Sequence, residues 1–428
     1  MATPAPVFDP QAVIEGRRPG RVRVGLIVGT ILAALCAIVA LGIDVLESVA
    51  SGHSVLPFVV ALPLALVPVP LLIAVILFLD RLEPEPRANL VFAFIWGAGV
   101  AALFAALFNT AGMVFITQPA LGATTGEYVS ATAGAPVIEE TLKGLVLVGL
   151  MWWRRQELDG PTDGVIYAAM VGLGFAMMEN IGYYMNALVN PVHGGAQLLG
   201  YTFVLRGVAS PLLHPIFTSM TGIGAAYAAS HRHAWWALPA GWVGAVLLHA
   251  TWNGLSVLGL PGLVLAYAIL ACAGIAIIVV IVADRRRIVR LITHCLPGYE
   301  RTGLISAGDI AMLATLRGRR RARNWARAAG GLPAAAAMSD YQLAATELAL
   351  LHQKSARRVI SDDRFAQRQH DLLGLMQVAR GVFLRRSPQP PEAPWAGPGS
   401  SGFTRQEAFA APVPRPVSSW PPARQPPQ

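Results

Sequence analysis

The chain has 428 residues, of which 54% are hydrophobic and only 13% are charged, and its formal net charge at pH 7 is +9. This composition excludes an ordinary soluble globular protein and predicts repeated apolar runs long enough to span a membrane. The positive charge is almost all arginine, which in a membrane protein marks cytoplasmic flanks, so we expect no nucleic-acid partner. Cys36, Cys272 and Cys295 form no CxxC pattern, and neither a disulfide framework nor a thiolate metal site is expected.

The apolar runs predict an all-α, polytopic integral membrane bundle of about eight transmembrane helices, each about 20 residues long or longer. The first run is too long for a cleaved signal peptide and is interpreted as a retained span. The predicted spans cover residues 23–46, 54–79, 88–115, 129–152, 163–189, 200–229, 234–258 and 262–283.

The loops between these spans predict the orientation of the chain. Arginines lie before the first span and in every second loop after it, whereas the alternate loops contain neither Arg nor Lys. These uncharged loops are SGHS, TQPALGATTGEY, NPVHGGAQ and LPG. By the positive-inside rule, both termini are cytoplasmic and the chain is a multi-pass protein of the cell (inner) membrane.

The composition changes along the chain predict four regions. They are a cytoplasmic N-terminal arm (1–22), a transmembrane domain (23–283), a small cytoplasmic basic and helical region (284–386) and a disordered Pro-rich tail (387–428).

The basic region contains three predicted helices. The first covers residues 306–330, begins with the capping pattern Ser306-x-x-Asp309 and carries six arginines. The other two cover residues 339–358 and 362–385. The arginine-rich helix could lie on anionic lipid or be a solvated connector, and the sequence leaves both interpretations open.

Several predicted spans contain ionisable or amide side chains near their centres. A charged side chain there costs about 2.5–3.5 kcal/mol, so such residues usually face a protein interior or a water-filled cavity. They come from the fourth to the seventh spans, which are consecutive and therefore expected to be neighbours. The residues are Glu139, Glu140 and Lys143, then Glu179 and Asn180, then His214, and then His249 and Asn253.

The spacing of these residues indicates which of them can interact. Lys143 lies four residues after Glu139 and three after Glu140, so it can pair with either carboxylate and keep it ionised. His249 and Asn253 are four residues apart and share a helix face. Two prolines in the sixth span are expected to loosen that helix and open space beside its histidine.

Carboxylates and imidazoles at matched depth fit two kinds of chemistry. They are ligands that zinc uses in catalytic sites, where one position stays open for water. They are equally the groups needed for general acid–base catalysis without a metal. Taken singly, they are also consistent with a structural ion pair, a packing histidine and an asparagine that joins helices. The chain has no GxSxG, HExxH, P-loop or strand-to-helix GxGxxG motif.

The motifs occur in a fixed order on successive predicted spans. They are Glu139-Glu140-x-x-Lys143, Asp163-Gly164, Gly172-x-Gly174-Phe175-x-x-x-Glu179-Asn180, His214 and His249-x-x-x-Asn253. In this order they resemble the PrsW family of intramembrane proteases, a branch of the superfamily that includes the CAAX prenyl proteases and the bacteriocin-processing enzymes. The resemblance covers about residues 90–260.

The resemblance implies a membrane endopeptidase that depends on a metal, with zinc as the expected ion. Its substrate would be a membrane-anchored protein, because the namesake of the family is similar to a site-1 protease that cleaves an anti-sigma factor. The lipid bilayer is the other expected partner. Prenyl-cysteine substrates are not implied.

The resemblance also implies roles for individual residues. The related prenyl proteases carry EExxxR, FxxxH and HxxxN, so Glu139 would be the base and Glu179 would replace the histidine of FxxxH. His249 and Asn253 would bind the oxyanion. The implied catalytic residues are Glu139, Glu140, Lys143, Glu179, His249 and Asn253. The implied metal ligands are Glu140, Glu179, His214 and His249, of which His214 is absent from the prenyl-protease pattern.

The sequence is consistent with three functions: an endopeptidase, a transporter or channel, and a membrane scaffold. The ordered motifs favour the endopeptidase. An endopeptidase would use Glu139 to activate water. A transporter or channel would use the same groups to relay protons or bind a coupling ion, but the inverted repeats typical of such proteins are not found. A membrane scaffold would use the polar cluster to hold its helices together, and its cytoplasmic helices and tail to recruit partners.

Overall fold

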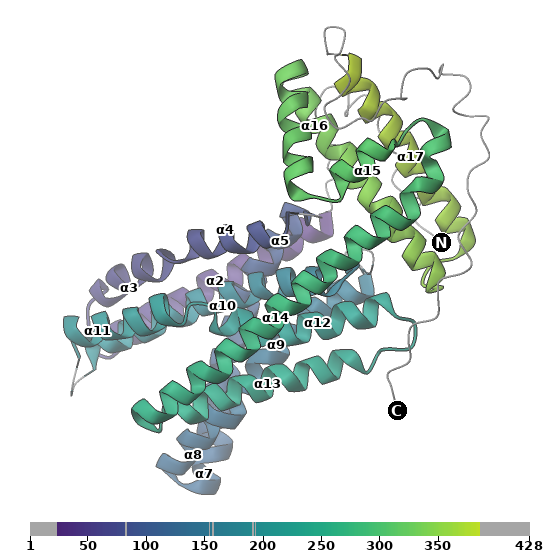
Figure 1. The fold of residues 1–428 in the computed structure, drawn as a ribbon. Helices are drawn as coiled ribbons and strands as arrows, with labels where there is room; N and C mark the ends of the chain where they lie inside the picture. The colour runs from purple at the N-terminus through teal and green to yellow at the C-terminus, as the bar shows by residue number, and fades with distance from the viewer. Residues whose placement is uncertain are drawn as a thin grey trace. The chain divides into compact units, whose positions relative to one another are not determined.

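The computed structural model describes residues 24–81, 84–153, 155, 158–190, 192 and 194–385 (Figure 1). Within these ranges the chain forms helices and no strand, which confirms the all-α prediction. The predicted N-terminal arm (1–22) and the predicted Pro-rich tail (387–428) lie outside the described residues.

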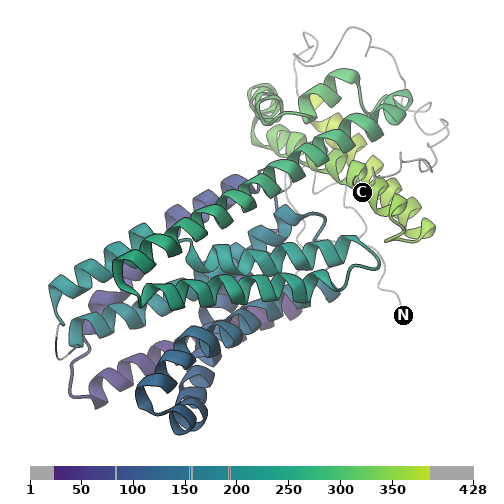
Figure 2. The same cartoon turned by 60° about the horizontal axis from the view of Figure 1, so that its bottom comes forward.

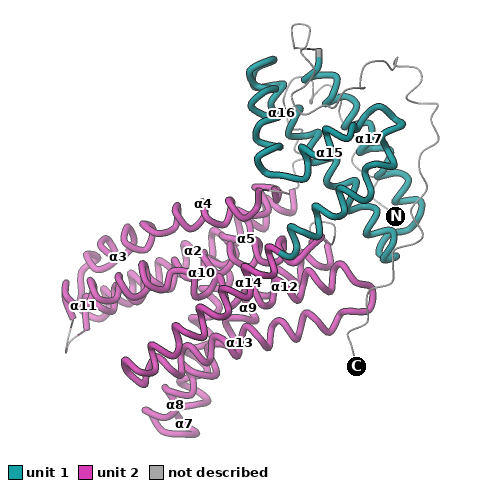
Figure 3. The backbone as a smooth tube through the Cα atoms, in the orientation of Figure 1, with its two compact units in different colours: residues 1–21, 283–428 teal, residues 22–282 magenta. Residues whose placement is uncertain are grey.

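The chain divides into two compact units, which Figure 3 colours separately. Of the described residues, those from Val24 to Val282 form the bundle unit and those from Ala283 to Arg385 form the C-terminal unit. The boundary falls within helix α14 (Gly259–Cys295). Each unit has its own hydrophobic core.

The bundle unit consists of α-helices joined by short turns and π-helical segments. Its α-helices are α2 (Val24–Ala50), α3 (Leu56–Leu66), α4 (Val69–Leu79), α5 (Arg87–Trp96), α6 (Ala102–Gly112), α7 (Gln118–Leu121), α8 (Ala123–Val129), α9 (Ala135–Trp153), α10 (Pro161–Val189), α11 (Ala196–Phe203), α12 (Leu213–Ser230), α13 (Ala237–Ser256) and most of α14. Its π-helical segments are η1 (Gly97–Ala101), η2 (Met113–Thr117), η3 (Ser130–Gly134) and η5 (Val204–Ala209). Such segments are frequent at functional sites, and η3 leads directly into α9.

Among the described residues, five helical stretches are long and apolar enough to cross a membrane. They are Val24–Ala50, Leu56–Leu79, Arg87–Leu121, Pro161–Val189 and Gly259–Thr302, and they overlap the first, second, third, fifth and eighth predicted spans. The other three predicted spans correspond to α9 with η3, to α11, η5 and α12, and to α13. The total of eight spans therefore stays a prediction.

Helix α10 is the central helix of the bundle unit. In the most apolar part of α10, 89% of the residues are buried inside the protein, against 6% for α2. α10 packs against α3, α5, α9 and α12, and α12 in turn packs along α13 (Figures 1 and 2). The apolar side chains of α2 remain exposed, including Ile31, Leu35 and Ile38, as expected for a helix whose outer face contacts lipid.

Glycines allow α10 to approach its neighbours closely. A Cβ atom at Gly172 would lie 2.6 Å from the backbone carbonyl carbon of His214, and one at Gly174 would lie 2.0 Å from the carbonyl oxygen of Phe94. Gly182, further along the same helix, has open space where a Cβ would be. The backbone of His214 is therefore held against α10 at a distance that only glycine allows.

The predicted sixth span is not one continuous helix. α11 and η5 are followed by a break, and α12 begins at Leu213. Leu212 has a non-helical backbone conformation, with φ of −101° and ψ of 9°. Pro211 lies in the break and Pro215 in the first turn of α12, where a proline removes no intrahelical hydrogen bond. The break places His214 at the start of α12.

The C-terminal unit contains the end of α14 and a further set of helices. They are the 3-10 helix η6 (Leu296–Thr302), α15 (Ala307–Leu313), α16 (Leu316–Ala356) and α17 (Asp362–Arg385). α16 consists of two helical segments separated at Gly330 and Gly331, and Gly331 has a φ of +72°. Its second segment and α17 surround a core that includes Met338, Tyr341 and Phe383.

His352 is buried in the C-terminal unit as a neutral imidazole. Its Nε2 lies 2.7 Å from the hydroxyl of Tyr299, and the side-chain amide of Gln369 donates to the same hydroxyl. The tyrosine hydroxyl therefore donates to His352, which needs a free lone pair on Nε2. Burial lowers the pKa of His352 from 6.5 to about 4.

The contact between Gly172 and His214 predicts a large effect of a single methyl group. Gly172→Ala should force α10 and α12 apart and lower the free energy of unfolding by about 1–3 kcal/mol. The matched variant Gly182→Ala adds the same methyl group to the same helix in open space and should cause no loss. Thermal unfolding of both variants in detergent would test this, and equal melting temperatures would contradict the described packing.

The buried imidazole predicts a pH dependence of the C-terminal unit. Because its pKa is lower in the folded state, the unfolded chain binds more protons between pH 6.5 and about 4. Stability should therefore fall on acidification through this window, by up to about 1.4 kcal/mol per pH unit. Hydrogen exchange of peptides containing His352, measured in the full-length protein and corrected for intrinsic rates, should report the change. His352→Gln should reduce it; an unchanged pH dependence in that variant would contradict the assignment.

Candidate active site

Three charged side chains are buried together in α9. The exposed fractions of Glu139, Glu140 and Lys143 are 5%, 0% and 0%. Nζ of Lys143 lies 3.2 Å from Oε2 of Glu139 and 2.9 Å from Oε1 of Glu140, so both pairings that the spacing allows are present. The same ammonium lies 3.7 Å from the ring centre of Phe175. Charges removed from water need such partners, because an unpaired buried charge is strongly destabilising.

Glu140 has the most complete set of hydrogen bonds in the cluster. Its Oε1 accepts from Lys143 and lies 3.1 Å from Nδ1 of His249. Its Oε2 accepts a 2.9 Å bond from the hydroxyl of Thr218 on α12. With both oxygens occupied and no exposure, Glu140 is suited to positioning its neighbours rather than to reacting.

His249 on α13 directs one ring nitrogen toward Glu139. Since a carboxylate only accepts, its Nδ1–H donates to Glu140, and in the neutral imidazole the lone pair is then on Nε2. This Nε2 lies 3.9 Å from Oε2 of Glu139. The ring stacks on Phe217, with the ring centres 4.8 Å apart. The imidazole is thus held in one orientation with a free nitrogen facing a carboxylate.

His214 on α12 is oriented from both sides. Nζ of Lys143 lies 2.9 Å from its Nδ1, and because an ammonium only donates, Nδ1 must accept. Nε2 therefore carries the hydrogen, and it lies 2.8 Å from Oε2 of Glu179 on α10. A carboxylate thus holds one nitrogen of each histidine. The other nitrogen accepts from Lys143 in His214 and lies 3.9 Å from Oε2 of Glu139 in His249.

Arg206 completes the support of Glu179. It lies in η5, and its guanidinium group bonds to Oε2 of Glu179 and donates a 2.7 Å bond to Oδ1 of Asn180. It also stacks on the ring of Tyr183, with 3.7 Å between its Cζ atom and the ring centre. Arg206 therefore holds three residues of one α10 turn and fixes the carboxylate that orients His214.

The cluster has the donors and the charge that a metal cation requires. Ligand atoms of Glu139, His214 and His249 lie within 4.8 Å of one another. With neutral imidazoles, the three carboxylates exceed the two cations, Lys143 and Arg206, by one formal charge. Two imidazoles and one carboxylate, with each imidazole hydrogen-bonded to a further carboxylate, form a donor set typical of catalytic zinc. A cation held there would compete with Lys143 for Nδ1 of His214.

Asn109 on α6 adds an unsatisfied oxygen beside this cluster. Its Nδ2 donates a 3.2 Å hydrogen bond to Oε1 of Glu139. Its Oδ1 is buried and has no hydrogen-bond partner among the described residues. A buried carbonyl oxygen without a donor indicates a place for water or a cation next to Glu139.

Two motif residues lie apart from the cluster. The side-chain amide of Asn253 donates a 2.9 Å hydrogen bond to the carbonyl oxygen of Ala131 in η3, at an exposed position. Oδ2 of Asp163 accepts from the backbone N–H groups of Asp159 and Gly160, at 2.7 and 2.8 Å. Asp163 therefore satisfies N–H groups at the start of α10, as a helix-capping residue does.

The structure thus brings together most of the residues singled out from the sequence, with the exceptions of Asn253 and Asp163. The residues that meet are Glu139, Glu140, Lys143, Glu179, His214 and His249. The sequence interpretation missed Asn109, Arg206 and Thr218. A signal for Arg206 was present, because it is a charged residue in the middle of a predicted span. Asn109 and Thr218 gave no comparable signal.

Comparisons with known proteins found matches over the segment that carries these residues. Residues 85–283 match the family described as PrsW family intramembrane metalloprotease. Protease PrsW of Geobacillus kaustophilus (strain HTA426) is 29% identical over 143 residues, which are 33% of this chain and 55% of that protein. The chain thus spans about half the length of this curated relative. A search of solved structures found no match.

These findings show a similarity to the PrsW family over the bundle unit. The matched segment contains every helix of the candidate site, from Asn109 on α6 to His249 on α13. The PrsW match and the apolar helices together support a membrane protein. The placement of this family within a wider superfamily rests on the sequence motifs alone.

The oriented histidines predict metal retention that depends on specific residues. Purified protein loaded with zinc and then desalted should retain the metal, and His214→Ala or His249→Ala should lose most of it. Glu179→Gln should weaken binding by about 10- to 100-fold, because it loosens the orientation of His214. Asn253→Ala is the matched control and should retain the metal. Elemental analysis would measure the zinc content of each variant, and equal zinc retention by all four variants would contradict the proposed metal site.

Proposed function

We propose that the chain is an intramembrane endopeptidase that hydrolyses peptide bonds of membrane-anchored proteins. The observation that supports this most strongly is the arrangement of Glu139, His214 and His249, with ligand atoms within 4.8 Å of one another. A general base beside two oriented imidazoles is a combination used for water activation. The PrsW match points to the same reaction class.

Glu139 is the proposed general base. It has fewer hydrogen bonds than Glu140, and 7% of its side chain is exposed, against 0% for Glu140. Glu139 takes a proton from a water molecule whose oxygen adds to the scissile carbonyl carbon. The proton then passes to the leaving amine as the carbon–nitrogen bond breaks, so that Glu139 is regenerated. The amide of Asn109 keeps the carboxylate in position.

A zinc ion held by His214 and His249, next to the carboxylate of Glu139, would polarise the water and the scissile carbonyl and would leave Glu139 to act as the base. In this assignment Glu140 and Glu179 orient the two imidazoles, and Arg206 fixes Glu179. Of the four metal ligands implied by the resemblance, the two histidines are therefore proposed as ligands, and Glu140 and Glu179 as the carboxylates that orient them.

Lys143 has a separate role in balancing charge. Its ammonium bridges two glutamates and His214, which lowers the cost of burying two adjacent carboxylates. Asn253 remains the proposed donor to the oxyanion. To reach the cluster, its amide has to leave the carbonyl oxygen of Ala131, where it is now bound.

The substrate is proposed to enter at the edge formed by Glu179 and Arg206. Their side chains are 24% and 16% exposed, whereas Lys143 is fully buried. This edge lies at η5 and the break before α12, where the backbone is not constrained by continuous α-helical hydrogen bonds. An anti-sigma factor is one candidate substrate, and both termini are proposed to be cytoplasmic in a multi-pass topology.

The central test is the loss of proteolysis on removing the proposed base. Glu139→Gln should lower cleavage by about 10²- to 10⁴-fold, because an amide cannot accept the proton. The matched control is Glu127→Gln, which makes the same change at an exposed glutamate of α8. New N-termini of membrane proteins would be compared by mass spectrometry in cells that make equal amounts of wild type, Glu139→Gln and Glu127→Gln.

Peptides that require Glu139 but not Glu127 would identify a protease and its substrates. Purified wild type should then cleave them in liposomes and lose activity with a chelator. Cleavage of the purified substrate by Glu139→Gln at the wild-type rate would contradict the proposal. Proton-coupled solute uptake by the purified protein without cleavage would instead favour a transporter, and loss of partner binding alone would favour a scaffold.

A further inference from the structure

One face of the first segment of α16 consists of arginines. Arg317, Arg320, Arg321 and Arg327 are all exposed, and we call them the arginine face. At 100° per residue they fall within a sector of about 120° of the helix surface, together with the exposed Asn324. The arginines are therefore gathered on one side.

The opposite side of the same segment packs into the core of the C-terminal unit. Ala322 and Ala326 are fully buried. Arg319 is also buried, and it donates 2.8 Å bonds to the carbonyl oxygen of Leu313 and to the hydroxyl of Thr346. Arg323 bonds to Gln342. Arg319 and Arg323 thus form hydrogen bonds within the unit and stabilise its fold, whereas the arginine face is exposed.

The arginine face has no ionic partner in the described part of the chain. No described carboxylate forms an ion pair with Arg317, Arg320, Arg321 or Arg327. Four like charges on one helix face repel each other and favour an anionic partner outside the unit. Since the fold does not require them, their clustering needs another physical reason.

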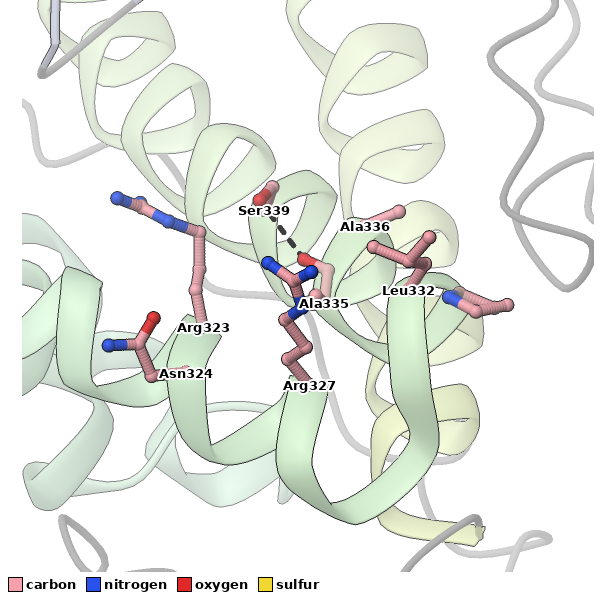
Figure 4. Close-up of a pocket in the computed structure, with 8 residues that line it drawn as sticks. Arg323, Asn324, Arg327, Leu332, Ala335, Ala336 and Ser339 are labelled. Carbon is pink, nitrogen blue, oxygen red and sulfur yellow. Dashed lines mark hydrogen bonds between the residues drawn. The ribbon is translucent and has the colours of Figure 1, made fainter.

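A pocket lies at the end of this face, beside the break at Gly330 and Gly331 (Figure 4). Arg323, Asn324 and Arg327 line it from the first segment of α16, and Leu332 and Ser339 line it from the second. Leu332 is 68% exposed, although it is a large apolar residue. Guanidinium groups beside an exposed leucine are the combination found where a helix lies in a lipid interface.

We propose that the arginine face of α16, with its adjoining pocket, binds the headgroups of anionic phospholipids. The last candidate span, Gly259–Thr302, continues into the C-terminal unit, so the chain itself connects this unit to the membrane. Each Lys or Arg that lies near a membrane surface is attracted by the anionic lipids. A nucleic acid is a weaker fit, because the nearby Trp325 packs against the core and offers no exposed ring for base stacking.

The test uses the full-length protein in vesicles. A nitroxide label is attached at Asn324→Cys, on the arginine face, in a variant whose three native cysteines are replaced by alanine or serine. Its accessibility to a water-soluble relaxation agent is measured in phosphatidylcholine vesicles and in vesicles that also contain phosphatidylglycerol. Accessibility should be about twofold lower in the anionic vesicles, and high salt should abolish the difference because it screens the charges.

Matched arginine variants control for loss of charge. Arg317→Gln, Arg320→Gln and Arg321→Gln combined should remove the difference between the two vesicle types. Arg301→Gln, Arg358→Gln and Arg364→Gln combined remove three exposed arginines from other parts of the same unit and should leave the difference between the vesicle types unchanged. Equal accessibility of the labelled parent in both vesicle types would overturn the proposal. So would protection by added RNA in phosphatidylcholine vesicles without protection by phosphatidylglycerol.

Discussion

The bundle unit depends on the burial of Glu139, Glu140 and Lys143 within one helix. Two adjacent carboxylates and one ammonium cannot be removed from water unless other groups complete their hydrogen bonds. Here those groups come from four other helices, through Asn109 on α6, His214 and Thr218 on α12, His249 on α13 and the ring of Phe175 on α10. The polar network therefore fixes how these helices are rotated against α9, which apolar packing alone would leave less specific.

The same constraint arranges the residues of the proposed active site. Each histidine has one nitrogen held by a carboxylate. The other nitrogen of His249 lies 3.9 Å from Glu139, and that of His214 accepts from Lys143, which itself pairs with Glu139. The close contact with Gly172 fixes where the backbone of His214 lies along α10. Because of the break before α12, His214 lies at the start of that helix and not in its middle. Arg206 then extends the network toward the partly exposed edge of the site. Stability and proposed chemistry thus rest on the same set of contacts.

Much of this could be predicted from the sequence, because helix periodicity and the cost of buried charge act locally. The all-α class and the pairing of Lys143 with its two glutamates follow from such rules. The pairing of His214 with Glu179 and the support from Arg206 do not, because they depend on the rotation of separate helices. Likewise, the sequence suggested that Asn253 shares a site with His249, but a four-residue spacing places two residues on one face only approximately, and Asn253 instead meets η3.

Glu139, His214 and His249 are proposed to act as one centre, and the coordination of a bound metal tests this most directly. X-ray absorption at the zinc edge of the purified, zinc-loaded protein reports the number of imidazole ligands. We predict scattering from two imidazoles together with oxygen ligands, and the loss of one imidazole in His249→Gln. A spectrum without imidazole scattering, or one that is unchanged in that variant, would contradict the claim.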